Sequence, residues 1–210
     1  MTLVERITGE DHKPRERRNR EAEMMAASLQ LFARNGYAAT TVQDVADAIG
    51  VLKGSIYHYI SSKEDLLFKI FLDAHVENEA LMHDILALDV SPIERLRAYL
   101  ERTLHITLHN IERTTLYFRD WRHLSGERHE TLTNYRTQYD RFLRKLIKDA
   151  TEAEGVQLDI SLKHISSFII GATNWVADWF TPENEQSIET IIKNYTALAI
   201  ASIMGAAKYR

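Results

Sequence analysis

The sequence predicts an all-α protein of about nine helices, with a small three-helix domain at the amino terminus and a larger helical body after it. Only 3 prolines and 8 glycines occur in 210 residues, so few positions interrupt a helix. Apolar residues recur at helical spacing along almost the whole chain, and no run shows the alternation of a strand. Capping signals separate the apolar stretches, which indicates a succession of helices.

The composition is that of a folded globular protein. Apolar residues make up 45% of the chain and charged residues 27%, far from the range of disordered chains. The absence of cysteine excludes disulfides, thiolate catalysis and thiolate metal sites. The amino terminus has no apolar core of signal-peptide length, and no apolar stretch is long enough to span a bilayer. We therefore expect a cytoplasmic protein without a membrane partner.

Charge is distributed unevenly along the chain, whose net charge is −4. Residues 12–63 hold eight Lys and Arg against five Asp and Glu, whereas residues 64–210 hold 17 against 22. A basic excess at one end and an acidic remainder indicate that the first segment alone meets an anionic partner.

Two helices are predicted before residue 50. The first spans about 15–35 and stops at Asn35-Gly36. A capping box formed by Thr40 and Gln43 opens a second, short helix, which Gly50 ends. The apolar stripe of the first helix consists of Ala22, Met25, Leu29 and Phe32, and that of the second of Val42, Val45, Ala46 and Ile49.

A third short helix, over about 52–59, follows a turn that forms a sharp corner. Ser61 and Glu64 then make another capping box, which starts a long fourth helix. We therefore divide the chain into domains of residues 1–60 and 61–210, joined through this fourth helix.

The body is predicted to contain five further helices. Ser91, Pro92 and Glu94 mark one start clearly, because they supply a cap, a proline at the first helical position and an acid that reaches back. The helices span about 92–110, 112–123 and 127–153, then from Asp159 to about Phe180, and from Thr181-Pro182 close to the end of the chain.

The three amino-terminal elements make a helix-turn-helix arrangement, in which a supporting helix precedes two short helices joined by a tight turn with glycine. A helix lying in the major groove exposes its leading side chains to base edges and phosphates, so these positions are not spent on the core. Val51, Ile56 and Ile60 are expected to face inward. The residues predicted to bind DNA are Thr41, Lys53, Gly54, Ser55, Tyr57, His58 and Lys63.

Each of these residue types suits contact with a duplex. Lys53 can reach a phosphate or a guanine edge, and Ser55 and Tyr57 offer hydroxyls at the level of the phosphates. Thr41 and Lys63 stand at helix amino termini, which favour phosphates. The alternative is that this aromatic segment packs inside the protein and has no role in recognition.

The stretch "ATTVQDVADAIGVLKGSIYHYISSKEDLL", residues 39–67, resembles the amino-terminal domain of the TetR family of bacterial transcriptional repressors. The shared pattern is a Thr-rich cap, a short helix ending in A-x-x-x-G-V, then K-G-S-x-Y and S-K-E-x-L. Leu52 stands where serine or threonine often caps the recognition helix, and Ile60 replaces the common phenylalanine. The resemblance implies a homodimer that reads a near-palindromic operator with recognition helices roughly 34 Å apart. It also implies that a small-molecule effector bound in the body swings the heads apart.

Two late segments support dimerisation independently of this resemblance. "HISSFIIGATNWVADWF" and "TIIKNYTALAIASIMGAA" are apolar or small over most of their circumference, which suits helices buried on two sides. The alternative is that both helices are buried within the monomer.

The segment "LYFRDWRHLSGERHETLTNYRTQYDRFLRKLI", residues 116–147, is similar to the corresponding part of TetR-type regulators of fatty-acid and sterol-ring catabolism, which respond to acyl-CoA thioesters. Such a ligand needs cations for its phosphates, a planar group for adenine and an apolar tunnel for the acyl chain. The alternative is that these arginines form surface pairs with nearby acids. The residues predicted to bind the effector are Tyr117, Trp121, Arg122, Tyr135, Tyr139 and Trp175.

Other functions find less support in the sequence. His105 and His109 lie four apart on one helix face, but no third ligand stands at metal-binding spacing, so neither a metal nor another cofactor is expected. No nucleophile elbow, phosphate-binding glycine loop or H-E-x-x-H motif occurs, and we expect no enzymatic activity. A helical ligand carrier or enzyme without DNA binding remains the alternative class, and activation of transcription uses the same head as repression.

Overall fold

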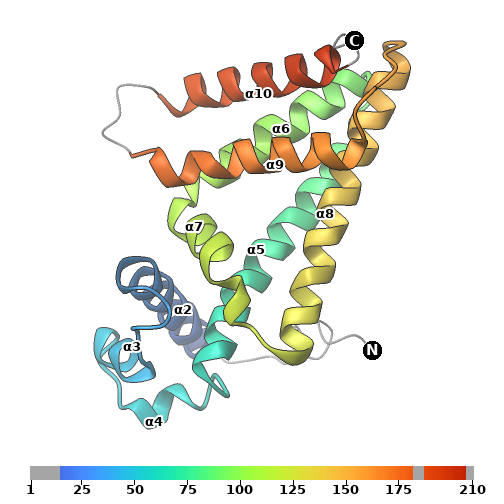
Figure 1. The fold of residues 1–210 in the computed structure, drawn as a ribbon. Helices are drawn as coiled ribbons and strands as arrows, with labels where there is room; N and C mark the ends of the chain where they lie inside the picture. Colours follow the sequence, from blue (N-terminus) through green and yellow to red (C-terminus); the bar gives the residue numbers. More distant parts are fainter. Residues whose placement is uncertain (1–14, 182–186, 207–210) are drawn as a thin grey trace. The chain divides into compact units, whose positions relative to one another are not determined.

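The computed structural model describes residues 15–181 and 187–206, and this part of the chain is built from helices without any strand (Figure 1). Nine α-helices, labelled α2 to α10, and one short 3-10 helix, η1, occur in the described ranges. The prediction of an all-α protein with about nine helices is confirmed. No helix in these ranges is long and apolar enough to cross a membrane.

The chain forms two compact units, Met1–Ile70 and Phe71–Arg210, and the division falls within α5 (Lys63–Leu86). The first unit contains α2 (Arg15–Asn35), α3 (Val42–Ala48), α4 (Lys53–Ile56) and the first turns of α5. The expected boundary after residue 60 and the division in the structure differ by these turns. Leu66, Leu67 and Ile70 are buried, which accounts for the inclusion of this segment in the first unit.

The apolar stripe predicted for α2 is partly wrong. Met24, Ser28 and Phe32 form the fully buried row, with spacing i, i+4 and i+8, whereas Ala22 is exposed and Met25 half-buried. Ser28 is accommodated because its hydroxyl donates to the carbonyl of Met24 at 2.7 Å. The stripe was predicted from apolar residues alone, so a buried serine whose hydroxyl bonds to the backbone of its own helix was not recognised as part of the buried row.

The predicted cap of α3 is wrong by one residue. Thr41 is the N-cap: its hydroxyl accepts from the amide of Asp44 at 3.2 Å, and the carboxylate of Asp44 accepts from the amide of Thr41 at 2.7 Å. The hydroxyl of Thr40 instead donates to the carbonyls of Gly36, at 2.9 Å, and Leu31, at 3.2 Å. Thr40 therefore ties the turn to the end of α2 and leaves the cap to its neighbour.

The predicted cap of α5 is also displaced by one residue. Ser62 directly precedes α5, and its hydroxyl accepts from the amide of Asp65 at 3.1 Å. The carboxylate of Asp65 reaches back to accept from the amide of Ser61 at 3.0 Å. Paired serines and paired acids offer two alternative caps one residue apart, which the sequence alone does not distinguish.

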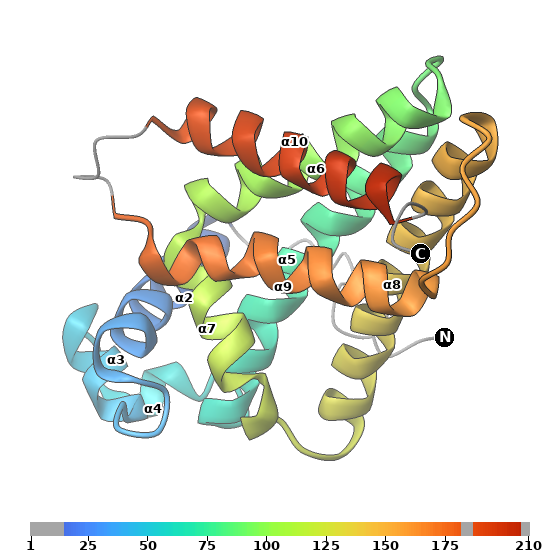
Figure 2. The ribbon, with the colours of Figure 1, turned by 45° about the horizontal axis from the view of Figure 1, so that its top comes forward.

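The second unit contains the rest of α5 and five further helices, among which α6 packs against α8, α9 and α10 (Figure 2). One core cluster joins these helices and includes Leu100, Leu146 and Ile203, and a second includes Leu104 and Val176. The elements are α6 (Pro92–His109), α7 (Ile111–Asp120), η1 (Trp121–His123), α8 (Gly126–Ala153), α9 (Leu162–Trp179) and α10 (Ile188–Gly205).

The predicted starts of these helices have different outcomes. The start at Ser91 and Pro92 is confirmed, since Ser91 caps α6 with its hydroxyl 3.4 Å from the amide of Glu94. The cap predicted at Asp159 is wrong, because Ser161 caps α9. The start predicted at Thr181-Pro182 lies partly outside the described residues, and α10 begins at Ile188 after its cap, Ser187.

Candidate nucleic-acid interface and effector cavity

The corner between α3 and α4 is short and is held by several backbone hydrogen bonds. Gly50 has a φ of +67°, the left-handed conformation that ends a helix and favours glycine. The amide of Val51 donates to the carbonyl of Ala46 at 3.0 Å, which returns the chain directly after α3. Leu52 is the N-cap of α4, and the amide of Ser55 donates to its carbonyl at 2.8 Å, without any side-chain cap.

The leading residues of α4 are directed away from the core, as the helix-turn-helix prediction requires. Lys53 and Gly54 are exposed, and Tyr57 at the end of the helix is 48% exposed. Ser55 is half-buried and Ile56 fully buried. The short helix thus presents one polar face and anchors the other in the protein. His58, in the turn that follows α4, and Ile60 continue this division, exposed and buried respectively.

Leu52 is a residue that sequence reasoning noted only as a missing cap. Its side chain is 81% exposed at the start of α4. A leucine this exposed beside Lys53 is a surface apolar group at the position where a recognition helix meets base edges. Its position in the motif, where a serine or threonine is common, was the only feature of the sequence that pointed to an exposed side chain here.

The hydroxyl of Thr41 is occupied by the helix cap. Besides accepting from the Asp44 amide, it donates to the Asp44 carboxylate at 2.9 Å. The two hydrogen bonds from Thr41 lower the pKa of the Asp44 carboxyl below its usual value. Thr41 therefore orients the amino terminus of α3, and a phosphate contact there would use the exposed backbone end of the helix.

Lys63 is half-buried and makes contacts within the protein that the sequence did not indicate. Its ammonium donates to the carbonyls of Tyr37 at 2.8 Å, Thr40 at 2.9 Å and Ala38 at 3.4 Å. It also lies 4.2 Å from the centre of the Tyr37 ring. Three acceptors match the three donors of an ammonium, so Lys63 fastens the start of α5 to the α2–α3 turn, and the structure leaves none of its donors to a phosphate.

The second unit contains a cavity of about 830 Å³ that is partly open to the surface. Its walls are mostly apolar and aromatic, a composition typical of small-molecule sites. Leu100, Leu143 and Ile169 supply aliphatic surface, and the groups with hydrogen-bonding or charged atoms include His75, Tyr99, Thr103, Arg113, Tyr117, Arg119, Arg136, Tyr139, Asp140, Asn174 and Trp175. Burial raises the pKa of Tyr99 to about 12, so this phenol is a neutral wall of the cavity.

Three of the six predicted effector residues line the cavity: Tyr117, Tyr139 and Trp175. Trp175 also extends outward from α9 and is 62% exposed. Burial raises the pKa of the Tyr117 hydroxyl, and the nearby Arg136 opposes this shift. These residues come from α7, α8 and α9, so helices distant in the sequence bring them together.

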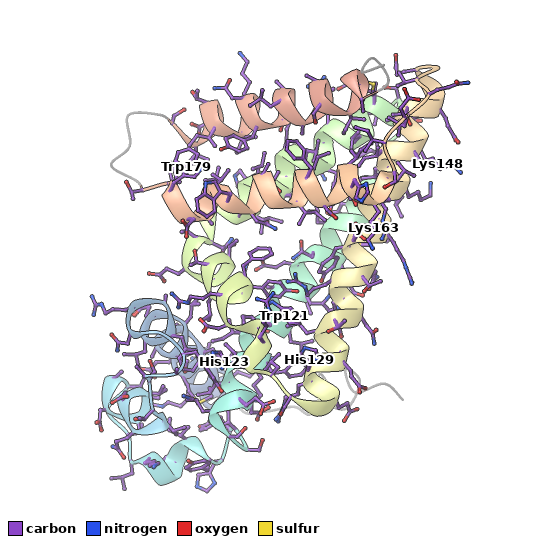
Figure 3. All side chains as sticks on the ribbon, in the orientation of Figure 1. Trp121, His123, His129, Lys148, Lys163 and Trp179 are labelled. Atoms are coloured by element: carbon purple, nitrogen blue, oxygen red, sulfur yellow. The ribbon has the colours of Figure 1, made fainter. Side chains whose placement is uncertain are left out.

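The structure does not place the other three predicted residues in the cavity wall. Trp121 stacks on His129, with ring centres 5.2 Å apart and planes 18° apart (Figure 3). Arg122 is exposed and lies 5.0 Å from the Trp121 ring. Tyr135 stacks against His75 at 3.2 Å. Their role in effector binding stays a prediction, and the structure shows that an aromatic or basic residue on a helix can pack against its neighbours instead of facing a cavity.

Arg136 is the basic residue of the cavity that the predicted set omitted. Its guanidinium lies 4.6 Å from the Trp121 ring and 5.7 Å from each of the rings of Tyr117 and Phe118. No acid among residues 15–181 and 187–206 forms an ion pair with it. By contrast, Arg113 at the same cavity holds Glu77 with two hydrogen bonds. The other cation of the wall, Arg119, is bonded to Asp120 at 2.8 Å.

His75 and Tyr139 of the cavity wall form a chain of three polar groups with Glu79, which lies outside the wall. The Nδ1 of His75 forms a short hydrogen bond with the hydroxyl of Tyr139, and its Nε2 lies 3.4 Å from Oε1 of Glu79. Burial lowers the pKa of His75, while Glu79 opposes this shift. Burial raises the pKa of Tyr139. The imidazole and the phenol are therefore both neutral at neutral pH.

The histidine pair considered as metal ligands, His105 and His109, makes contacts within its own helix. The rings of His105 and His109 stack at 3.9 Å, and Nδ1 of His109 lies 2.8 Å from the carbonyl of His105. In the part of the chain that the structure describes, no group of three or more His, Cys, Asp or Glu is placed to hold a metal ion.

A helix-turn-helix unit with an exposed recognition helix, followed by a helical unit with a ligand-sized cavity, defines a ligand-responsive DNA-binding regulator. Residues 24–70 match the family of bacterial regulatory proteins, tetR family. Residues 89–203 match the tetracyclin repressor-like, C-terminal domain. The chain belongs to the TetR family of transcriptional regulators, as its residue pattern predicted.

Individual relatives agree with this assignment. The HTH-type transcriptional repressor KstR2 of Rhodococcus jostii (strain RHA1) is 26% identical over 183 residues, which cover 86% of this chain and 89% of that protein. A solved TetR/AcrR family regulator from Thermobifida fusca YX-ER1 is 30% identical, with a TM-score of 0.67 and coverage of 91% and 99%. The structure of AibR in complex with isovaleryl coenzyme A and operator DNA shares the fold, with a TM-score of 0.77, 22% identity and coverage of 85% and 97%.

Proposed function

We propose that this protein is a cytoplasmic transcriptional repressor that binds a near-palindromic operator as a homodimer and leaves it when an acyl-CoA thioester occupies the cavity. The exposure of Lys53, Gly54 and Tyr57 beside the buried Ile56 carries the DNA-binding part of this proposal. The repressor assignment follows the name of the relative KstR2. The protein acts by binding and not by catalysis, in line with its family.

The contacts with DNA divide between phosphates and bases. Lys53 pairs with a phosphate or a guanine edge, and Ser55 and His58 donate to phosphates. Tyr57 places its hydroxyl at a phosphate and its ring at a thymine methyl. Leu52, exposed at the start of the same helix, supplies an apolar contact with a thymine methyl.

The backbone completes this surface. Gly54 lets the helix approach the duplex closely, and the capped start of α3 at Thr41 directs free amides toward a phosphate. Lys63 contributes indirectly, because its hydrogen bonds to the α2–α3 turn hold the start of α3 in place.

The homodimer is supported by apolar residues on the last two described helices. Phe168 and Trp175, seven residues apart on one face of α9, are 64% and 62% exposed, and Leu198 on α10 is 66% exposed. Exposed large apolar side chains are typical of an interface, and helices that were wholly buried within the monomer would not leave them accessible. A second copy of the chain is the partner that covers this surface.

The effector is bound by the cavity of the second unit. Its aliphatic and aromatic wall suits an acyl chain, and the hydroxyls of Tyr117 and Tyr139 can form hydrogen bonds with polar groups of the ligand. Arg136, which no acid neutralises in the described ranges, supplies a cation for a phosphate. The AibR complex with isovaleryl coenzyme A shows that the same fold accommodates a ligand of this class. Trp175 borders both the cavity and the exposed face of α9.

Helix α5 connects the two activities through the chain itself. It begins with Lys63 in the first unit and carries Ala74, His75 and Asn78 of the cavity wall in the second. An effector that displaces these side chains therefore acts on a helix that also belongs to the DNA-binding unit.

The test of DNA binding uses a fragment of the promoter region upstream of the protein's own gene. Affinity should fall steeply with added salt, and Lys53→Ala and Tyr57→Ala should weaken it. Lys148→Ala, which removes an exposed lysine of α8 (Figure 3), is the matched control and should bind as the parent does. Binding that ignores both salt and the two α4 substitutions would contradict the proposal.

The test of the effector is a thermal-shift comparison of acyl-CoA thioesters with the corresponding free acids. Thioesters should raise the unfolding temperature in a concentration-dependent way and should release the promoter fragment. Stabilisation by free acids alone would replace the thioester with a carboxylate effector, and no stabilisation by any CoA ester would remove the thioester.

A further inference from the structure

Glu79, His75 and Tyr139 form a chain of hydrogen-bonding groups that ends in the cavity wall at Tyr139. Glu79 and His75 lie one turn apart on α5, and Tyr139 faces them from α8. His75 is 4% exposed, and its ring stacks on that of Tyr135 with planes 12° apart. The imidazole is thus held by packing on one face and by polar partners at both nitrogens.

The chemistry of the three groups fixes the direction of the chain. A carboxylate only accepts hydrogen bonds, so the favoured tautomer of a neutral His75 carries its proton on Nε2, toward Glu79. The Nδ1 atom then has a lone pair and no proton. Because Nδ1 is the atom in contact with Tyr139, the phenol must donate its hydrogen to His75.

We propose that this chain makes Tyr139 an acceptor toward the cavity, so that the effector presents a hydroxyl to it and a carbonyl at the same place is rejected. The single hydrogen of the phenol is committed to His75, and a ligand carbonyl would meet an oxygen lone pair. The class of ligand that forms a hydrogen bond with Tyr139 is a hydroxyacyl thioester, in preference to the oxoacyl thioester with the same acyl chain length. This inference rests on the proposed function, because it concerns the same cavity.

Two features of the wall agree with a selective role for Tyr139. Tyr139 and Arg136 are three residues apart on α8, so a ligand whose anionic part pairs with Arg136 passes Tyr139 on the same helix face. The hydroxyls of Tyr99 and Thr103, both in the wall, lie one turn apart on α6, and a hydrogen bond between them moderates the raised pKa of Tyr99. Such a bond uses one of the two hydroxyl hydrogens. The other can serve a carbonyl of the ligand, such as that of the thioester, which leaves Tyr139 to accept a hydrogen bond from a ligand hydroxyl.

The first test measures the tautomer of His75 directly and needs no ligand. Nitrogen-15 NMR of the full chain, with labelled histidine and with His75→Phe to assign the resonance, distinguishes the two neutral tautomers. We expect the proton on Nε2 at pH 7.5 in the parent protein, and the same tautomer in Tyr139→Phe, because Glu79 selects it. A proton on Nδ1 would reverse the chain and overturn the inference.

The second test compares matched ligands. Dissociation constants are measured by calorimetry for 3-hydroxyacyl-CoA and 3-oxoacyl-CoA pairs with butyryl, hexanoyl and octanoyl chains. A single hydrogen bond of ordinary net strength predicts that the hydroxy member of the best-bound pair binds roughly three- to tenfold more tightly. The ratio should approach one in Tyr139→Phe and in His75→Phe, where the phenol is absent or free to donate. Tyr195→Phe, a change of the same kind on α10, should keep the parental ratio.

The possible results separate the inference from the proposed function. An oxoacyl thioester that binds as tightly as its hydroxy partner, or more tightly, overturns the selective role of Tyr139 and leaves the thioester effector standing. Failure of every CoA ester to bind removes the thioester from the proposed function and with it the hydroxyacyl ligand, whereas the tautomer measurement still reports which way the hydrogen bond between His75 and Tyr139 runs.

Discussion

Replacing Lys63 by Met tests whether its ammonium stabilises the protein through hydrogen bonds to the α2–α3 turn or binds a DNA phosphate. The substitution keeps the length of the stem and removes the ammonium, which donates to the carbonyls of Tyr37 and Thr40 at 2.8 and 2.9 Å and to that of Ala38 at 3.4 Å. Hydrogen bonds that involve a charged group contribute roughly 1.5–3 kcal/mol each when they are buried. Lys63 is partly exposed and the freed carbonyls regain water, so we expect a total loss of about 2 kcal/mol in unfolding free energy.

The loss is measured by urea or thermal unfolding of the full chain. At roughly 2–4 °C for each kcal/mol in a chain of this length, the unfolding temperature should fall by about 4–8 °C. The salt dependence of operator affinity should stay parental at temperatures where the variant is folded. Lys53→Met is the matched control: it should leave stability within about 0.5 kcal/mol and reduce the salt slope by about 0.9 for each protomer.

The opposite pattern would refute the reasoning. If Lys63→Met unfolds with the parental free energy and its salt slope drops by about 0.9 per protomer, Lys63 binds a phosphate in solution and the carbonyl contacts are not stabilising. This was the role predicted for it from sequence.

Three further predictions follow from the sites described above. Thr41→Ala should lower the unfolding free energy by about 1 kcal/mol through loss of the α3 cap, as measured by urea denaturation. Thr41→Ser keeps a capping hydroxyl and should leave the unfolding free energy close to that of the parent. Arg136→Leu should keep the fold by circular dichroism and weaken acyl-CoA binding at least tenfold in calorimetry, with parental affinity counting against a role for its charge. His75→Phe should remove part of the acid sensitivity of stability. The buried ring, which faces the Glu79 carboxylate and two tyrosines, has a pKa below its ordinary 6.5, so the unfolded chain binds the proton more readily and parental stability falls as pH drops through 6.5. Equal losses in parent and variant between pH 7.5 and 5.5 would contradict this.

The helix-turn-helix was predictable because its determinants are local. Gly50 ends α3, Ile56 anchors α4, and the polar residues between them have no place in the core. The cap positions were the exception. Thr40 and Thr41 are chemically equivalent neighbours, and only the carbonyls that Thr40 meets at the end of α2 decide which of them caps α3.

The cavity could be predicted only in part, because its wall is assembled from helices far apart in the sequence. Arg122 and Arg136 look alike in a basic, aromatic segment, yet Arg122 lies in η1 and is exposed while Arg136 on α8 reaches the cavity. His75 lies more than sixty residues before Tyr139, and no periodicity joins them. The carbonyl contacts of Lys63 could not be predicted for the same reason, since its acceptors lie about 25 residues earlier.

The surroundings of Trp121 supply the protein with an optical reporter. Its indole is packed against His129 and lies 4.6 Å from the guanidinium of Arg136, which belongs to the cavity wall. Indole emission responds to nearby charge, so an anion that draws Arg136 away from the ring will alter the fluorescence of the unlabelled protein. Ligand titrations can thus be followed by the intrinsic tryptophan fluorescence. Comparison with Trp121→Phe separates the signal of Trp121 from the emission of Trp175 and Trp179.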